Sequence, residues 1–174
     1  ATAIWSAAHD RRVKAVVSAV GVGDGPVWFR SVRSDAEWQD AMAIADRDRI
    51  ERLETGRSRM IERARILWLD PESKRISAAG RAGTTAGAAT DIPAEFIDET
   101  MGFRPLWVVD KVAPAALLLI TTDGDLVVPK AEAERLYAAA NEPKRLVTLK
   151  GFGHYAVYSG EAFRQTMAAT LEWL

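Results

Sequence analysis

The sequence predicts an α/β fold in which a parallel sheet is flanked by helices. Three short apolar runs, at 13–20, 115–120 and 145–149, have the composition and the polar or glycine boundaries of buried strands. Segments with helical periodicity lie between them. Because strands joined through helices pair in parallel with right-handed crossovers, we expect the three runs to belong to one open sheet.

The first half of the chain carries several helix signals. Residues 1–8 are a helix-like stretch before the first strand. Ser34 and Glu37 form the Ser-x-x-Glu pattern of a capping box, so an amphipathic helix should begin there. A second apolar stripe predicts another helix, which Asp70-Pro71 should end because proline cannot donate the helical hydrogen bond. The residues of that stripe are Met60, Ala64, Leu67 and Trp68.

The second half alternates strands with helices. The glycine-rich segment 80–90 lacks periodicity and should connect two packed regions. A short helix is expected around 95–101, a longer one after the second strand, and a final helix at the end of the chain. The apolar residues of the longer helix are Ala133, Leu136, Tyr137 and Ala140, and those that stripe the final helix are Phe163, Met167, Thr170, Leu171 and Leu174.

The composition is that of a globular protein and excludes several function classes. The chain has 174 residues, 48% of them apolar, and a net charge of −1, so no bulk field favours nucleic acids or membranes. It contains no cysteine, which excludes disulfides, thiolate metal ligands and a cysteine nucleophile within it. The longest apolar run, 113–120, is far shorter than the ~20 residues of a membrane helix. We therefore expect a soluble protein. The composition leaves the compartment open; we assign the protein to the cytoplasm and expect it to use no cofactor.

Two polar turns follow neighbouring strands and carry groups suited to acid–base chemistry. Asp123-Gly124-Asp125 comes after one apolar strand, and Gly151-Phe152-Gly153-His154 comes after the next. Ligands of an open parallel sheet bind beyond the carboxyl ends of its strands, where these turns should meet. A carboxylate that orients an imidazole, and an imidazole that takes a proton from a nucleophile, are two members of a catalytic triad. The 29 residues from Asp125 to His154 leave room for one helix and one strand.

From about Ala113 to Leu174 the order of motifs resembles the end of the α/β-hydrolase superfamily, and its dienelactone-hydrolase and esterase-like members in particular. The shared features are a strand, Asp-Gly-Asp-x-x-Val-Pro, a helix, a strand, Gly-x-Gly-His and a terminal helix. The resemblance implies that Asp125 is the acid and His154 the base of the triad. It also implies a partial fold, with residues 1–25 and 93–174 in the hydrolase core and residues 26–92 as a helical cap insertion.

The nucleophile of that family is not found in this sequence. In the family a serine lies in Gly-x-Ser-x-Gly, a strained strand-to-helix turn, and none of the eight serines here has the flanking glycines. The resemblance places this turn a few residues before Ala1. We therefore expect an amino-terminal companion segment that supplies the nucleophile, and we expect residues 1–174 alone to be inactive. A further departure is Thr121-Thr122, where the family often has His-Gly.

The predicted activity is hydrolysis of an ester, thioester or amide bond in a small molecule. Trp28 and Phe29, after the glycines that follow the first strand, and Tyr155, beside the base, are the candidates for lining the pocket. Two alternatives stay open. An aspartate nucleophile would make the protein a dehalogenase or epoxide hydrolase, and a retained acid and histidine without turnover would make it a ligand-binding or receptor module.

Some of the site residues have alternative interpretations. Asp123 is the second candidate for the acid, and Asp125 could serve only to form its turn. Asp123 and Asp125 together could hold a cation, but no third ligand is close in sequence, so we predict no metal site. His9 ends an apparent helix before a charged stretch and is assigned to the surface.

Overall fold

The computed structural model describes residues 1–75 and 91–174. They divide into two compact units: unit 1 comprises Ala1–Asp24 and Arg104–Leu174, and unit 2 comprises Gly25–Phe103. Residues 93–103, which the sequence assigned to the carboxy-terminal core segment, are part of unit 2. The predicted connection at 80–90 lies outside the described residues.

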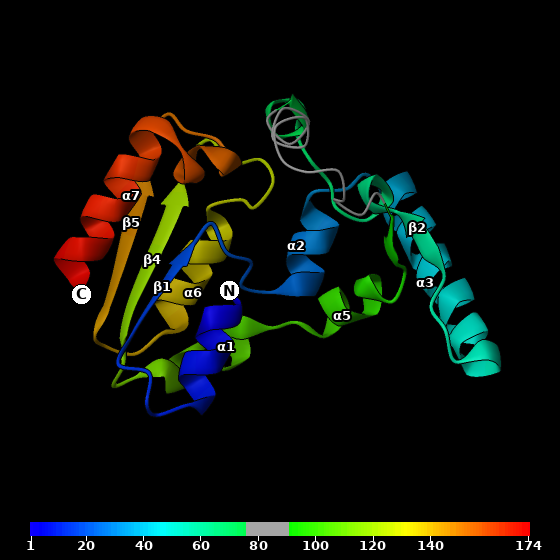
Figure 1. Cartoon of the computed structure of the whole chain (residues 1–174), viewed down its shortest axis with the longest axis horizontal. Helices are drawn as coiled ribbons and strands as arrows, with labels where there is room; N and C mark the ends of the chain where they lie inside the picture. Colours follow the sequence, from blue (N-terminus) through cyan, green and yellow to red (C-terminus); the bar gives the residue numbers. More distant parts are fainter. Residues whose placement is uncertain (76–90) are drawn as a thin grey trace. The chain divides into compact units, whose positions relative to one another are not determined.

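Unit 1 is built on a parallel sheet with the strand order β1-β4-β5 (Figure 1). The strands are β1 (Ala15–Ala19), β4 (Ala116–Thr122) and β5 (Lys144–Leu149). Each lies where an apolar run was predicted, and the parallel pairing is confirmed. In β4 every residue from Leu117 to Thr122 is buried, because the strand is central and is covered on both faces.

Helices cover the two faces of this sheet, and alternate residues of β4 point to each. Leu117 and Leu119 pack into a core with α1 (Thr2–His9), α6 (Ala131–Ala139) and the 3₁₀ turns η2 (Pro105–Trp107) and η3 (Val109–Val112). Leu118 and Ile120 face the second core, with α7 (Gly160–Trp173) and the 3₁₀ turn η4 (His154–Tyr158). Unit 1 is therefore a three-layer α/β unit.

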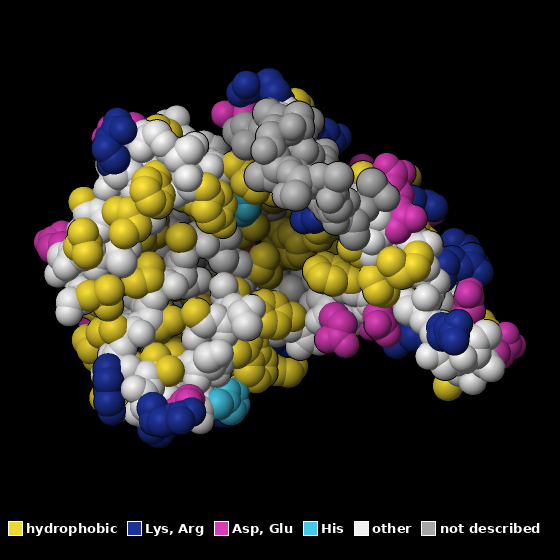
Figure 2. Space-filling view, viewed as in Figure 1, with side chains coloured by type: hydrophobic (Ala, Val, Ile, Leu, Met, Phe, Trp, Pro, Cys, Tyr) yellow, Lys and Arg dark blue, Asp and Glu magenta, His cyan; other side chains and the backbone are white. Residues whose placement is uncertain are grey.

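The face that α7 buries differs from the face that its apolar periodicity indicates. The helix is where the sequence predicts it, but its buried residues are Ala162 and Thr166. Small side chains let the helix lie close to the sheet. The apolar stripe instead faces outward, with exposed fractions from 38% for Met167 to 72% for Leu174. Figure 2 shows hydrophobic side chains gathered along the place of α7.

The loop after β1 is fixed by contacts within unit 1. The Glu132 carboxylate, on α6, accepts hydrogen bonds from the amides of Gly23 and Asp24, at 2.8 and 2.9 Å. The Asp24 carboxylate lies 3.1 Å from the Arg104 guanidinium. Because Asp24 and Arg104 are the residues of unit 1 next to the two crossings into unit 2, this ion pair ties the crossings together.

Unit 2 combines helices with a short antiparallel ribbon, and one sequence prediction fails here. Its elements are α2 (Gly25–Ser31), α3 (Asp35–Thr55), β2 (Met60–Glu62), the 3₁₀ turn η1 (Arg63–Arg65), β3 (Asp91–Pro93) and α5 (Phe96–Gly102). The predicted capping box at Ser34 and Glu37 is confirmed. The helix predicted from the stripe that begins at Met60 is wrong, because β2 pairs with β3.

Asp70-Pro71 starts a helix rather than ending one. Residues 71–75 are helical, and the Asp70 carboxylate accepts hydrogen bonds from the amide of Ser73 at 2.7 Å and from its hydroxyl at 3.0 Å. These bonds are those of an N-cap. Proline is favoured at the first helical position, where its missing amide donor costs nothing.

A network of ion pairs joins α3 to α5. Asp48 is buried and lies 2.8 Å from Arg52. Arg49 and Arg52 both bind Asp98. The hydrogen bond from Arg49 is the largest of the effects that hold the pKa of Asp98 below its ordinary value, and the charges of both arginines and the hydrogen bond from Arg52 add to it.

Among the described residues, no helix is long and apolar enough to cross a membrane.

Candidate active site

The acid turn, Asp123-Gly124-Asp125, follows the carboxyl end of the central strand β4. The side chain of Asp125 has no exposed surface. Its Oδ1 atom accepts hydrogen bonds from the amides of Val127 and Val128, at 2.9 and 2.7 Å. These two bonds satisfy one oxygen of the buried carboxylate and fix its plane, so that the other oxygen points in a defined direction.

That second oxygen binds the histidine of the neighbouring turn. The Nδ1 atom of His154 lies 2.8 Å from Oδ2 of Asp125, and the histidine side chain is 12% exposed. An ionised carboxylate only accepts hydrogen bonds, so Nδ1 carries the proton in this contact. Nε2 is therefore the ring nitrogen that can accept a proton from another group. The structure thus brings Asp125 and His154 together.

Aromatic residues of η4 stand beside the imidazole. The ring of Tyr155 meets that of His154 edge to face, with centroids 4.9 Å apart, and Tyr158 lies against Tyr155. Partial burial raises the pKa of Tyr158, and the nearby Tyr155 and Asp125 raise it further, so its hydroxyl stays protonated at neutral pH. Leu126, next to the acid, is 63% exposed. Neither Tyr158 nor Leu126 was singled out from the sequence, because neither belongs to a motif.

The two other candidate pocket residues belong to unit 2, and the second histidine belongs to α1. Trp28 and Phe29 are buried on α2 in unit 2, where the Phe29 ring contacts Trp38 edge to face and the Arg33 guanidinium lies over it. His9 is exposed at the end of α1, and its Nδ1 atom lies 2.8 Å from the Trp5 carbonyl oxygen.

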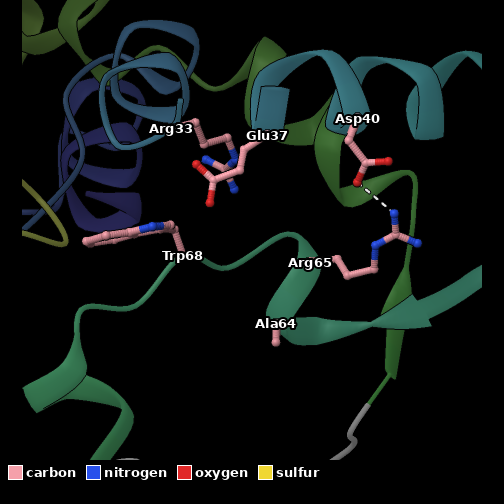
Figure 3. Close-up of a pocket in the computed structure, with 6 residues that line it drawn as sticks. All are labelled: Arg33, Glu37, Asp40, Ala64, Arg65 and Trp68. Carbon is pink, nitrogen blue, oxygen red and sulfur yellow. Dashed lines mark hydrogen bonds and ion pairs between the residues drawn. The ribbon is translucent and has the colours of Figure 1, made fainter. Parts of the chain in front are cut away.

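A cavity of about 140 Å³ lies within unit 2 and does not include the acid or the histidine (Figure 3). Its lining residues are Arg33, Glu37, Asp40, Ala64, Arg65 and Trp68. Several of its charged groups bind other groups of unit 2. Arg65 pairs with Asp40 at 2.6 Å, Arg33 donates to the carbonyls of Phe29 and Ile66, and Glu37 closes the capping box. Desolvation lowers the pKa of Arg33 to about 10, which leaves it cationic at neutral pH.

Solved structures show which fold this arrangement belongs to. The α/β hydrolase GrgF from Penicillium sp. sh18 matches 98% of this chain with a TM-score of 0.72 and 19% identity, and the chain covers 58% of that protein. DcsB, solved with its substrate analogue, matches 98% with a TM-score of 0.73 and 23% identity, over 59% of its length. A monoacylglycerol lipase from Paleococcus ferrophilus matches 99% with a TM-score of 0.67 and 18% identity, over 63% of its length. The chain therefore has part of an α/β-hydrolase fold.

Sequence comparison finds relatives whose own functions are uncharacterized. No family model matches the chain. An uncharacterized 31.7 kDa protein in the traX-finO intergenic region of Escherichia coli is 27% identical over 169 residues, which are 97% of this chain and 58% of that protein. The uncharacterized protein YfhR of Escherichia coli (strain K12) is 37% identical over 62 residues, 34% of this chain. The chain thus spans somewhat more than half the length of the first relative.

Proposed function

We propose that this chain supplies the acid and the base of a serine-type α/β hydrolase that cleaves an ester, thioester or amide bond in a small molecule. The observation that carries the proposal is the contact between Asp125 and His154 at the carboxyl edge of the sheet. An imidazole that is oriented by a buried carboxylate, itself held by two backbone amides, is suited to general base catalysis.

In the proposed reaction, Nε2 of His154 takes the proton of a serine hydroxyl as that oxygen attacks the substrate carbonyl. Asp125 stabilises the imidazolium that forms. The imidazolium then gives its proton to the departing alcohol, thiol or amine, which leaves an acyl-enzyme, and the same histidine activates water to release the acid. Over the whole cycle the serine proton leaves with the departing group and water supplies the proton that restores the serine, so the proposed steps balance with no oxidant or reductant.

The serine is assigned to an amino-terminal segment. The backbone nitrogen of Ala1 lies close to Gly21, just beyond the carboxyl end of β1, since a Cβ atom built on Gly21 would be 3.1 Å from it. Asp125 and His154 follow the carboxyl ends of the neighbouring parallel strands. Residues preceding Ala1 would therefore enter the sheet edge at which the acid and the base meet, and this favours a nucleophile from that side.

Of the predicted pocket residues, Tyr155 keeps its assignment in this proposal because its ring lies against the imidazole. The assignment of residues 26–92 to a helical cap insertion, which the family resemblance implies, stays a prediction. A closer relation to dienelactone hydrolases stays a prediction.

The test uses the complete protein, expressed from its whole reading frame, and a fluorophosphonate probe, which modifies activated serines. We expect stoichiometric labelling of a serine in Gly-x-Ser-x-Gly and hydrolysis of p-nitrophenyl esters. His154→Ala should abolish both. His9→Ala is the matched control and should change neither, because His9 lies exposed on α1.

Two outcomes would count against the proposal. If residues 1–174 by themselves become labelled, the nucleophile is inside the chain. If the complete protein has no Gly-x-Ser-x-Gly serine and hydrolyses no ester, the alternatives with an aspartate nucleophile or with ligand binding alone replace it.

A further inference from the structure

The acid turn and the histidine loop, Gly151-Phe152-Gly153-His154, are joined by further hydrogen bonds besides the contact between Asp125 and His154. The amide of Asp123 donates to the Leu149 carbonyl at 3.1 Å. The amide of Gly124 donates to the Phe152 carbonyl, also at 3.1 Å. In the opposite direction, the amide of Gly151 donates to Oδ1 of Asp123 at 2.7 Å. Asp123 is thus the side chain that ties the start of the histidine loop to the acid turn.

We propose that Asp123 is a positioning residue for His154, because its carboxylate holds Gly151 and so fixes the loop that carries the imidazole. This inference rests on the proposed function of the pair. Asp123 acts on the loop backbone at Gly151, three residues before the base, and the acid that contacts the imidazole is Asp125. Its proposed role therefore differs from that of a second acid or a metal ligand.

The loop needs such a restraint because of its composition. Gly151 has a φ of +77°, a left-handed conformation that glycine adopts readily, and Gly153 follows two residues later. Glycine loses the most conformational freedom when it is ordered, so a loop with two glycines is held poorly by its own backbone. The side-chain oxygen of Asp123 supplies the acceptor that holds the Gly151 amide.

Small displacements of this loop matter for catalysis. Proton transfer requires Nε2 within hydrogen-bonding distance of the hydroxyl that it deprotonates, and misplacement by about 1 Å can cost as much as 10²-fold in rate. Loss of the bond from Gly151 should broaden the distribution of His154 positions. The consequence is a lower kcat, while the binding of the substrate stays nearly constant.

The choice of variants separates the hydrogen bond from the charge. Asp123→Ala removes the acceptor, whereas Asp123→Asn keeps an amide oxygen that can accept from Gly151. Asp10→Ala is the matched control, since Asp10 is another carboxylate that accepts a backbone amide of its own turn, that of Arg12 at 3.0 Å, but lies after α1.

The experiment measures kcat and KM of the complete protein with a p-nitrophenyl ester. Asp123→Ala should lower kcat about tenfold, the factor that corresponds to the loss of one net hydrogen bond, with KM changed less than about twofold. Asp123→Asn and Asp10→Ala should both stay within about threefold of the parent. The nuclear magnetic resonance signal of the His154 Nδ1 proton should broaden in Asp123→Ala and stay sharp in Asp123→Asn.

The inference fails if Asp123→Ala keeps the parent kcat, or if Asp123→Asn is as damaging as Asp123→Ala, which would assign the effect to charge. Failure of the proposed function gives a different result, since the unaltered protein would then be inactive. In that case the Nδ1 proton signal still decides whether Asp123 orders the histidine loop.

Discussion

Replacing Asp125 by asparagine tests how the buried carboxylate controls His154. The substitution keeps the shape of the side chain but exchanges one oxygen for an NH₂ group. The backbone decides which oxygen position is kept. Because the amides of Val127 and Val128 both donate to Oδ1, the asparagine oxygen should occupy that position and its NH₂ group should face Nδ1 of His154.

The energy that favours this orientation follows from the two backbone donors. In the opposite orientation the amides of Val127 and Val128 would meet an NH₂ group instead of an acceptor. A buried donor without a partner costs about 1–3 kcal/mol, so the two together favour the first orientation by roughly 2–6 kcal/mol. An NH₂ group donates a hydrogen bond and therefore requires Nδ1 of His154 as an acceptor. The imidazole proton must then move to Nε2, which can no longer act as a base.

The assay is ¹⁵N nuclear magnetic resonance of the imidazole in the complete protein, with kinetics on the same samples. We expect His154 to carry its proton on Nδ1 in the parent and on Nε2 in Asp125→Asn. The analogous change in an unrelated serine protease lowers kcat about 10⁴-fold, and we expect a fall of that order here. Combination with His154→Ala should add little, because members of one catalytic unit are not additive. A histidine that stays protonated on Nδ1 in Asp125→Asn would refute the reasoning.

Three further predictions concern stability and association. Asp98→Asn should destabilise unit 2 by about 1 kcal/mol at pH 7, because the pKa of Asp98 is lowered by Arg49 and Arg52. The lowered pKa means that the unfolded chain takes up a proton on Asp98 before the folded protein does. The difference from the parent should therefore be complete above about pH 4 and shrink as the pH falls below that value; urea unfolding at several pH values measures it. Gly124→Ala should cost about 1–3 kcal/mol in the same assay, since its Cβ atom would lie 2.8 Å from the Phe152 carbonyl oxygen. Residues 1–174 alone should self-associate in sedimentation experiments, because β1 is an edge strand in the described sheet and α7 exposes an apolar stripe, and a stable monomer would contradict this.

The parts of the fold that the sequence predicts well are those in which local and long-range forces agree. The run 115–120 is apolar and unbroken because both faces of the central strand are covered. The capping box at Ser34 and Glu37 depends only on residues within one helical turn. The contact between Asp125 and His154 was also predictable, because parallel strands bring their carboxyl ends to one edge.

The failures occur where a distant partner overrides the local pattern, or where one local pattern fits two structures. Met60 and Trp68 lie on a stripe with helical spacing, which predicted a helix. Residues 60–62 instead pair with residues 91–93, and the local sequence around Met60 carries no signal for that pairing. Asp70-Pro71 was taken as a helix end, although the same pair suits a helix start in which Asp70 caps the first turn. Pattern alone does not distinguish the two, since both place proline outside a helix interior.

The site shows the same limit at the level of single atoms. Sequence spacing ranked Asp125 above Asp123 as the acid, and the contact of Asp125 with His154 agrees with that order. It offered no role for Asp123 beyond a second acid or a metal ligand, because its partner is a backbone amide that no residue pattern encodes. The proposals therefore give the two aspartates of this turn different roles. In them, one oxygen of Asp125 sets the tautomer of His154, and one oxygen of Asp123 holds the loop that carries His154. Asp123→Ala removes the acceptor for the Gly151 amide, whereas Asp123→Asn keeps an oxygen that can accept from it. Only the comparison of these two variants separates the loss of the hydrogen bond from the loss of the charge.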